Sequence, residues 1–236
     1  MLQIKVFCFN PFGENTYLLW DAPSGEGVIV DPGCYEDDES AQLYSFIEKE
    51  GVKPKAILLT HGHFDHVFGV TETSQKYSIP VYMHPDDSVM LEFNRKIVGP
   101  FGLSEPDVSF PFEPIYDGQE LSILEHPFTV IHTPGHTPGG VCLYDKDSSV
   151  LLTGDTLFAG SIGRSDLPFG DYDKLIVSIM DKLMGLPADT EILPGHGPVS
   201  NIGQERTHNP FLQPFNEKWD DGQGVEGIFI SSDDII

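Results

Sequence analysis

Residues 60–66 read THGHFDH and follow an apolar, strand-like run, so we expect them where a strand turns into a loop. His61 and His63 are two residues apart, which lets both imidazoles point the same way from extended backbone. Asp65 and His66 are neighbours and must point elsewhere. Four metal-ligand side chains in two pairs predict two adjacent metal ions held by one loop, against the alternative of a polar loop with a chance run of histidines.

Three turns further along the chain carry one ligand-type residue each. His136 lies in TPGHTPGG, Asp155 in LLTGDT and His196 in ILPGHGP, and each turn follows an apolar run. One such residue alone is usually a capping or packing side chain. Four strand ends of this kind in one chain predict a metal centre.

The ligand series resembles that of the metallo-β-lactamase superfamily, and the flanking sequence is most similar to its glyoxalase II-type hydrolases, including the short forms without an extra helical domain. The resemblance extends through residues 209–211. The stretches that carry it are NPFGENTYLL (10–19), VDPG (30–33), GHTPGG (135–140), GSIGRSDLP (160–168), IGQER (202–206) and NPF (209–211).

The resemblance implies an α/β (α+β) fold, a four-layer αββα sandwich in which two mixed sheets lie back to back, with helices outside and metals at one edge. The sequence itself shows only that each half contains strands, a ligand turn and a helix. We expect a catalytic domain at residues 1–212 and an acidic C-terminal tail at residues 213–236, with one short strand at 227–230.

The resemblance also implies a dinuclear metal centre. Zinc is the expected metal, and a mixed nitrogen and oxygen donor set also accepts iron or manganese. The implied ligands are His61, His63 and His136 for one ion, Asp65, His66 and His196 for the other, and Asp155 as the bridge.

In this family such a centre makes hydroxide near neutral pH, so we expect a hydrolase that attacks a thioester such as S-lactoylglutathione. Asp65 and Asp155 are the expected catalytic residues, with Asp65 orienting the nucleophile. Arg164 matches a substrate-contacting basic position of glyoxalase II, and an ion pair with Asp166 is the alternative. Pro198 stands where those enzymes usually have tyrosine, which weakens the glutathione assignment but not the hydrolytic one.

Other activities remain open on sequence grounds. A persulfide dioxygenase would use one iron held by His61, His136 and Asp155. A lactonase and a non-catalytic metal-binding module are the further alternatives. Many zinc β-lactamases have cysteine at the position of Asp155, and the diiron reductases have glutamate at that of His63, so neither activity is expected.

The composition restricts the partners. The chain of 236 residues has 37 acidic and 13 basic residues and a formal net charge of −24, which argues against nucleic acids and anionic membrane surfaces. No 18-residue apolar run and no signal peptide are evident. Cys8, Cys34 and Cys142 are odd in number, so we expect reduced core or near-core thiols in a cytoplasmic protein.

The remaining pattern predicts the regular elements. Residues 97–118 lack periodicity and either line a binding site or form a passive insertion. His84 and His132 are expected to be structural, His126 solvated and His208 on the surface. Strands are predicted at 2–9, 15–21, 26–31, 54–59, 81–84, 128–131 and 191–194, and helices at 38–50, 67–77, 86–96, 171–184 and 201–208.

Overall fold

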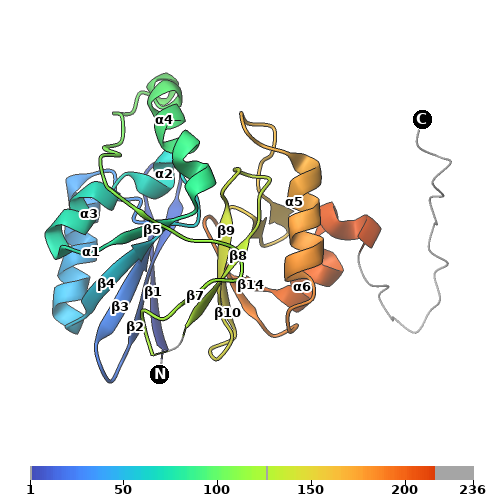
Figure 1. Cartoon of the computed structure of the whole chain (residues 1–236), viewed down its shortest axis with the longest axis horizontal. Coiled ribbons are helices and arrows are strands. Elements are labelled where there is room, and N and C mark those ends of the chain that lie inside the picture. Colours follow the sequence, from blue (N-terminus) through green and yellow to red (C-terminus); the bar gives the residue numbers. More distant parts are fainter. Residues whose placement is uncertain (1, 126, 216–236) are drawn as a thin grey trace.

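Two sheets of six strands each lie face to face in the part of the chain that this computed structural model describes, residues 2–125 and 127–215 (Figure 1). The first sheet belongs to the N-terminal half. Its order is β1 (Leu2–Phe9), β2 (Glu14–Asp21), β3 (Glu26–Val30), β4 (Lys53–Leu58), β5 (Val81–Met83) and β6 (Glu113–Pro114).

The second sheet belongs to the C-terminal half. Like the first, it mixes antiparallel pairs with parallel ones, β3–β4 in one sheet and β10–β13 in the other. A separate two-stranded ribbon joins β11 (Leu157–Phe158) and β12 (Ser161–Ile162). The order of the second sheet is β14 (Ser200–Asn201), β13 (Glu191–Pro194), β10 (Val150–Gly154), β9 (Val141–Asp145), β8 (Phe128–His132) and β7 (Glu120–Leu121).

The helices cover the outer faces of both sheets (Figure 1). The first half contributes α1 (Asp37–Glu50), α2 (Phe64–Val67), α3 (Val70–Tyr77) and α4 (Ser88–Ile97), and the second half α5 (Tyr172–Ser178) and α6 (Ile202–His208). Short turns complete the set: η1 (Pro85–Asp87), η2 (Gly99–Phe101), η3 (Ile179–Leu183) and η4 (Pro210–Phe215).

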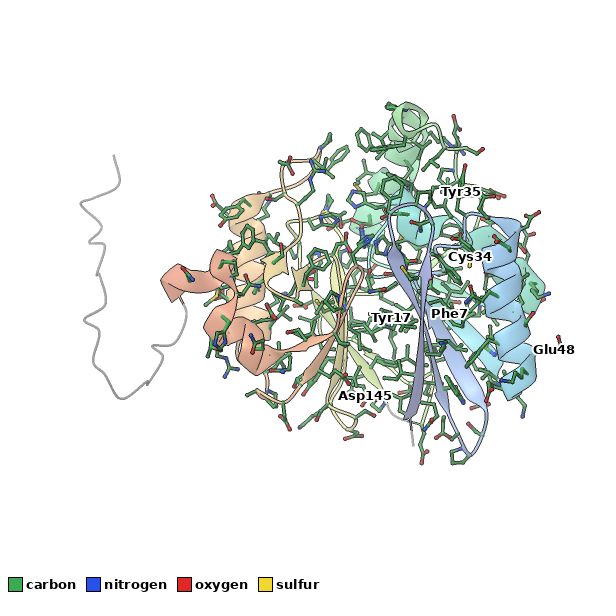
Figure 2. All side chains as sticks on the ribbon, turned by 180° about the vertical axis from the view of Figure 1, so that it is seen from behind. Phe7, Tyr17, Cys34, Tyr35, Glu48 and Asp145 are labelled. Carbon is green, nitrogen blue, oxygen red and sulfur yellow. The ribbon has the colours of Figure 1, made fainter. Side chains whose placement is uncertain are left out.

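Apolar side chains fill the three interfaces between these four layers. Leu19 and Leu58 from the first sheet pack with Leu143 and Leu152 from the second, and all four are buried. Tyr17, which Figure 2 shows between the two halves, belongs to the same cluster. Each fully buried leucine contributes about 1.5–3 kcal/mol to folding. The four-layer αββα sandwich predicted from the sequence is confirmed.

The structure differs from the predicted elements at two helices. The helix expected at 67–77 is divided in two: α2 (Phe64–Val67) begins inside the histidine motif, and α3 begins only at Val70. The helix expected at 171–184 is α-helical only to Ser178 and continues as a π-helical turn. Residues 97–118 are irregular, as predicted, apart from the short η2 and β6.

The cysteine prediction was partly wrong. All three cysteines are free, and Cys34 and Cys142 are buried, but Cys8 is exposed. Cys8 lies in β1, where successive side chains alternate between the two faces, and its neighbours Phe7 and Phe9 take the buried face.

Of the expected acidic tail, only residues 213–215 are described, and they belong to η4. The possible strand at 227–230 and His126 lie outside the described residues. Among the residues that are described, no helix has the length and apolarity needed to cross a membrane.

Candidate metal centre

The histidine motif lies directly after β4. His61 lies in the loop after the strand, and His63, the residue that precedes α2, has extended backbone (φ −66°, ψ 150°). Asp65 and His66 belong to the first turn of α2. This change from extended to helical backbone directs the two pairs of side chains toward two different places, as the spacing predicted.

The motif meets the three downstream residues in two groups. His61, His63 and His136 bring their nitrogens together, with His63 Nδ1 and His136 Nε2 2.9 Å apart. Asp65, His66 and His196 form the second group. In it, His196 Nε2 lies 3.2 Å from Asp65 Oδ2 and 3.3 Å from His66 Nε2.

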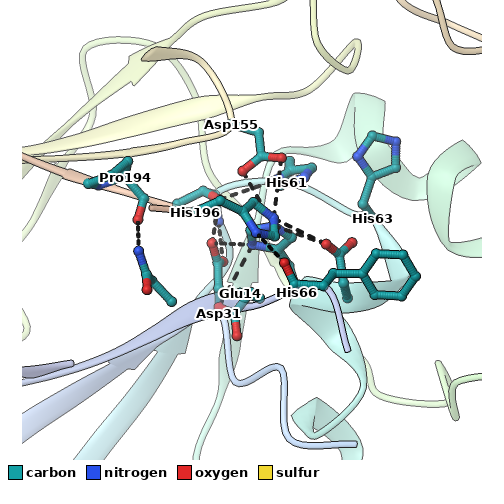
Figure 3. A network of polar contacts seen from close by, with 12 residues as sticks. Glu14, Asp31, His61, His63, His66, Asp155, Pro194 and His196 are labelled. Atoms are coloured by element: carbon teal, nitrogen blue, oxygen red, sulfur yellow. Dashed lines mark hydrogen bonds and ion pairs between the residues drawn. The ribbon is translucent and has the colours of Figure 1, made fainter. Parts of the chain in front are cut away.

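Asp155 lies between the two groups (Figure 3). Its Oδ2 is 3.4 Å from His136 Nε2 in the first group and 3.7 Å from His196 Nε2 in the second. Its Oδ1 is 3.4 Å from His66 Nε2. One carboxylate therefore faces both groups.

The donor set fits two divalent metal ions. Tetrahedral ligands at about 2.0–2.1 Å from zinc are separated from one another by roughly 3.3 Å, close to the distances within each group. Two donor atoms, His61 Nε2 and Asp155 Oδ1, are buried without a hydrogen-bond partner among the described residues. Buried polar atoms of this kind need a partner, and a metal ion would supply it.

In the first histidine group, the pKa values of His61 and His63 are shifted in the direction that favours metal binding. Burial, reinforced by neighbouring His136, lowers the pKa of His63 to about 3. Burial also holds the pKa of His61 well below its usual range. Both imidazoles are therefore neutral near pH 7, with the lone pair that a metal requires.

The pKa shifts of Asp155 and His66 favour the charged form of each side chain, whereas those of His61 and His63 favour the neutral form. Burial alone would raise the pKa of Asp155, but the charge of the neighbouring His66 imidazolium holds it well below the usual range. Burial opposes a charge on His66, yet Asp155 and Asp65 raise the pKa of His66 well above its usual range. Asp155 is thus an anion, and His66 retains a proton that a metal must displace.

Backbone carbonyls fix the orientation of two of the imidazoles. His136 Nδ1 lies 2.7 Å from the Arg164 carbonyl oxygen, and His196 Nδ1 lies 3.2 Å from that of Phe12. Because a carbonyl accepts, each Nδ1 carries the hydrogen, and Nε2 is free to face the centre.

Asp31 and Glu14 support the centre from below (Figure 3). Asp31 accepts hydrogen bonds from the backbone and hydroxyl of Thr60, at 2.7 and 2.5 Å, and its Oδ2 lies 3.0 Å from His66 Nδ1. Glu14 is fully buried, accepts a hydrogen bond from Thr16, and lies 4.0 Å from His66 Nδ1. Sequence analysis did not identify Glu14, which is the acid in NPFGENTYLL.

Asp87 is a second acid that sequence analysis missed. It is buried and accepts hydrogen bonds from the backbone of Gly62 (2.8 Å) and Gly139 (2.5 Å) and from the Thr137 hydroxyl (2.8 Å). The loop of His61 and the turn of His136 are therefore tied to one carboxylate. No pattern in the sequence distinguishes Asp87 from an exposed helix-start acid such as Asp86.

Arg164, predicted to contact substrate, forms an exposed ion pair with Asp166, with N–O distances of 2.9 and 3.0 Å. Its backbone, rather than its side chain, reaches the centre.

His84 and His132 lie outside both groups. Their rings stack in parallel, with centroids 4.0 Å apart and an interplanar angle of 9°. With Asp86 they form a further cluster of ligand-type residues. A metal lies in the plane of each imidazole that binds it, so two parallel rings cannot share one, and the pair is a packing contact.

A family model described as the metallo-beta-lactamase superfamily matches residues 9–196, which include all seven predicted ligands. The probable metallo-hydrolase YqgX of Bacillus subtilis is 38% identical over 209 residues, covering 88% of this chain and 96% of that protein. The hydroxyacylglutathione hydrolase GloC of Haemophilus influenzae is 36% identical over 213 residues, covering 89% of this chain and 98% of that protein.

Two solved structures are similar to this one. The B3 metallo-beta-lactamase BLEG-1 superposes with a TM-score of 0.80 and 38% identity, covering 89% of this chain and 99% of its own. TTHA1623 in a di-iron-bound form superposes with a TM-score of 0.79 and 38% identity, covering 88% of this chain and 100% of its own.

Proposed function

The chain belongs to the metallo-β-lactamase superfamily, and from that premise we propose that it is a metal-dependent thioester hydrolase. S-lactoylglutathione is the first substrate to test, because GloC of Haemophilus influenzae is a hydroxyacylglutathione hydrolase. Zinc is the proposed metal. The di-iron form of TTHA1623 supports iron as the other candidate.

One observation carries the proposal: Asp155 lies within 3.4 Å of an imidazole nitrogen of each histidine group. A carboxylate can bind two cations through its two oxygens, so this position supports a dinuclear rather than a mononuclear centre. The proposed ligands are His61, His63 and His136 on one side, Asp65, His66 and His196 on the other, and Asp155 between them.

Bound divalent metals supply a Lewis acid and lower the pKa of water toward neutrality. The protein's own part is to position the reactants. The Asp65 side chain is 12% exposed, more than the fully buried His66, and its Oδ2 lies 3.2 Å from His196 Nε2. We assign to Asp65 the task of orienting the attacking water and accepting its proton as the water oxygen attacks the thioester carbonyl carbon. The C–S bond then breaks, and the thiolate leaves as a thiol with the proton that Asp65 took up.

Arg164 remains the proposed contact for an anionic group of the substrate. Its side chain is 67% exposed and its partner Asp166 is 70% exposed, and an ion pair of this kind contributes only about 0–1 kcal/mol. A substrate carboxylate can therefore replace Asp166 at little cost.

The proposed partner is a small thioester rather than a nucleic acid or a membrane, because the net charge of −24 repels polyanions. The three free cysteines support a reducing compartment such as the cytoplasm.

The test measures metal content by mass spectrometry together with hydrolysis of S-lactoylglutathione by the purified protein. We expect two metal ions per chain and thioester cleavage. Asp155→Ala should lose both metal and turnover. One iron with oxygen uptake on a persulfide would identify a dioxygenase instead, and lactone cleavage without thioester cleavage would identify a lactonase.

A further inference from the structure

One face of α4 lies against the histidine motif. Met90, Phe93 and Asn94 share this face, because residues three and four apart are neighbours on a helix. Asn94 Nδ2 donates to the Gly62 carbonyl at 2.8 Å, and a Cβ added to Gly62 would lie 3.0 Å from Met90 Cβ. Phe93 therefore projects from a helix face that is fixed on the loop of His61 and His63.

The segment of residues 163–171 is fixed on the other side of the centre. At its start, a Cβ added to Gly163 would lie 1.9 Å from the Asp155 carbonyl oxygen and 3.2 Å from His136 Cβ. At its end, the backbone of Asp171 donates to the Gly135 carbonyl at 2.8 Å. Figure 1 shows this segment, just before α5, and α4 rising beyond the same end of the two sheets.

Phe169 occupies a strained position in this segment. The Gly170 N–H donates to the Leu167 carbonyl at 2.9 Å, which closes a turn with Pro168 and Phe169 at its centre. Phe169 has φ +72°, at a turn position that normally requires glycine or asparagine. A bulky residue with positive φ is an outlier, and such strain is concentrated at functional sites.

The Phe169 ring contacts Phe93 across the boundary between the two halves. The ring centroids are 5.4 Å apart at an interplanar angle of 84°, an edge-to-face contact. Phe169 nevertheless remains 46% exposed. An aromatic side chain that is strained, half exposed and shared between two segments beside the centre has apolar surface left for a ligand.

We propose that Phe93 and Phe169 form an apolar wall that binds the acyl group of the substrate and favours large apolar acyl groups over small ones. This inference rests on the proposed thioester hydrolysis. Arg164 lies on the same segment, five residues before Phe169, and would contact the anionic carrier while the two rings contact the acyl group. The wall thus makes Phe169 a specificity-determining residue.

Two glutathione thioesters test the acyl preference alone. S-mandeloylglutathione and S-lactoylglutathione both carry a 2-hydroxyacyl group and differ by a phenyl ring in place of a methyl group. We expect the wild-type protein to have a kcat/KM about tenfold higher for the mandeloyl substrate, because a hydrophobic pocket discriminates by about that factor or more.

Phe169→Gly removes the ring and also relieves the backbone strain. It should abolish the mandeloyl preference, chiefly through KM, while Tm stays unchanged or rises. Phe93→Ala should reduce the preference and lower Tm, because the strained turn then loses its partner. Tyr172→Ala is the matched control, since Tyr172 is an aromatic residue just after the segment and 51% exposed, and it should keep the wild-type ratio.

Equal kcat/KM for the two thioesters in the wild type, or a ratio unchanged in Phe169→Gly, would overturn the wall and leave the hydrolase proposal intact. A Phe169→Gly protein with a lower Tm and an unchanged substrate ratio would show that Phe169 serves stability rather than specificity. Turnover of neither thioester by the metal-loaded wild type would overturn the proposed function, and the acyl preference with it.

Discussion

Asp87 joins two segments that are far apart in the sequence. Its carboxylate accepts from Gly62, beside His61, and from Thr137 and Gly139, beside His136. Each buried donor deprived of its acceptor costs about 1–3 kcal/mol. The residue therefore positions His61 and His136 of the first histidine group without belonging to either group.

We expect Asp87→Ala to lower the free energy of unfolding by about 3 kcal/mol or more, because three buried donors lose their acceptor. At about 2–4 °C per kcal/mol, Tm should fall by roughly 6–12 °C, measured by thermal denaturation. Thr137→Val removes one donor and leaves Asp87 two, so its Tm should fall by only about a third as much. Equal effects of the two substitutions would contradict the role of Asp87.

Protonation should oppose metal binding at the second histidine group. In the metal-free protein, Asp155 and Asp65 overcome burial and raise the pKa of His66, and a hydrogen bond that His196 donates to Asp65 likewise overcomes burial and raises the pKa of His196. Metal affinity is therefore full above these raised pKa values and is lost as pH falls through them, from above the ordinary histidine value of about 6.5. His61 and His63, whose pKa values are lowered, remain neutral.

Calorimetric titration with Zn²⁺ at pH 7 in two buffers of different ionisation enthalpy should therefore detect proton release. We expect about one to two protons per protein. Their absence would show that His66 and His196 are neutral before metal binds.

At the scale of elements, the long strands and helices follow from hydrophobic periodicity, so the sequence predicted β1, β2, α1 and α6 to within about two residues. The two-residue strands β6, β7, β11, β12 and β14 have no such pattern, because tertiary pairing alone makes them strands. The start of α2 at Phe64 was missed for a related reason: a helix of four residues is too short to show hydrophobic periodicity.

Strand β2, in the first half, is hydrogen-bonded to the turn that carries His196 in the second half. Asn15 Nδ2 donates to the carbonyls of Pro194 (3.0 Å) and Gly197 (2.9 Å), and Tyr17 Oη donates to that of Pro194 (2.8 Å). Figure 3 shows the contact at Pro194 beside the centre. The accepting carbonyls, those of Pro194 and Gly197, lie on either side of His196 in the sequence.

We expect Asn15→Ala to loosen His196 and reduce the bound metal from about two ions toward one per chain, measured by mass spectrometry after dialysis. The first histidine group contains no residue of this turn and should keep its ion. Tyr17→Phe removes a single hydrogen bond, worth about 1 kcal/mol, and should retain both ions. Loss of both ions in Asn15→Ala would mean that the two groups do not bind independently.

The whole molecule brings the centre together from both halves. His61, His63, Asp65 and His66 come from the first half, and His136, Asp155 and His196 from the second. The sequence singled out these seven residues because each follows a strand end, and the structure brings them close together. The sequence could not predict Glu14 and Asp87, because a supporting carboxylate is recognised only by the groups that fold against it.

Because both halves supply ligands, metal should bind the folded chain and not the unfolded one. A ligand at a hundred times its Kd then stabilises a protein by about 2.7 kcal/mol, so chelation should lower Tm by roughly 5–11 °C.

This loss of Tm on chelation should be larger at pH 8 than at pH 6, because a protonated His66, paired with Asp155, stabilises the metal-free fold at low pH. That support is full below about pH 6.5 and is lost as pH rises through the raised pKa of His66. Thermal denaturation with and without chelator at both pH values measures this difference, and added Zn²⁺ should restore Tm. A Tm indifferent to chelator at pH 8 would contradict a metal centre that joins the two halves.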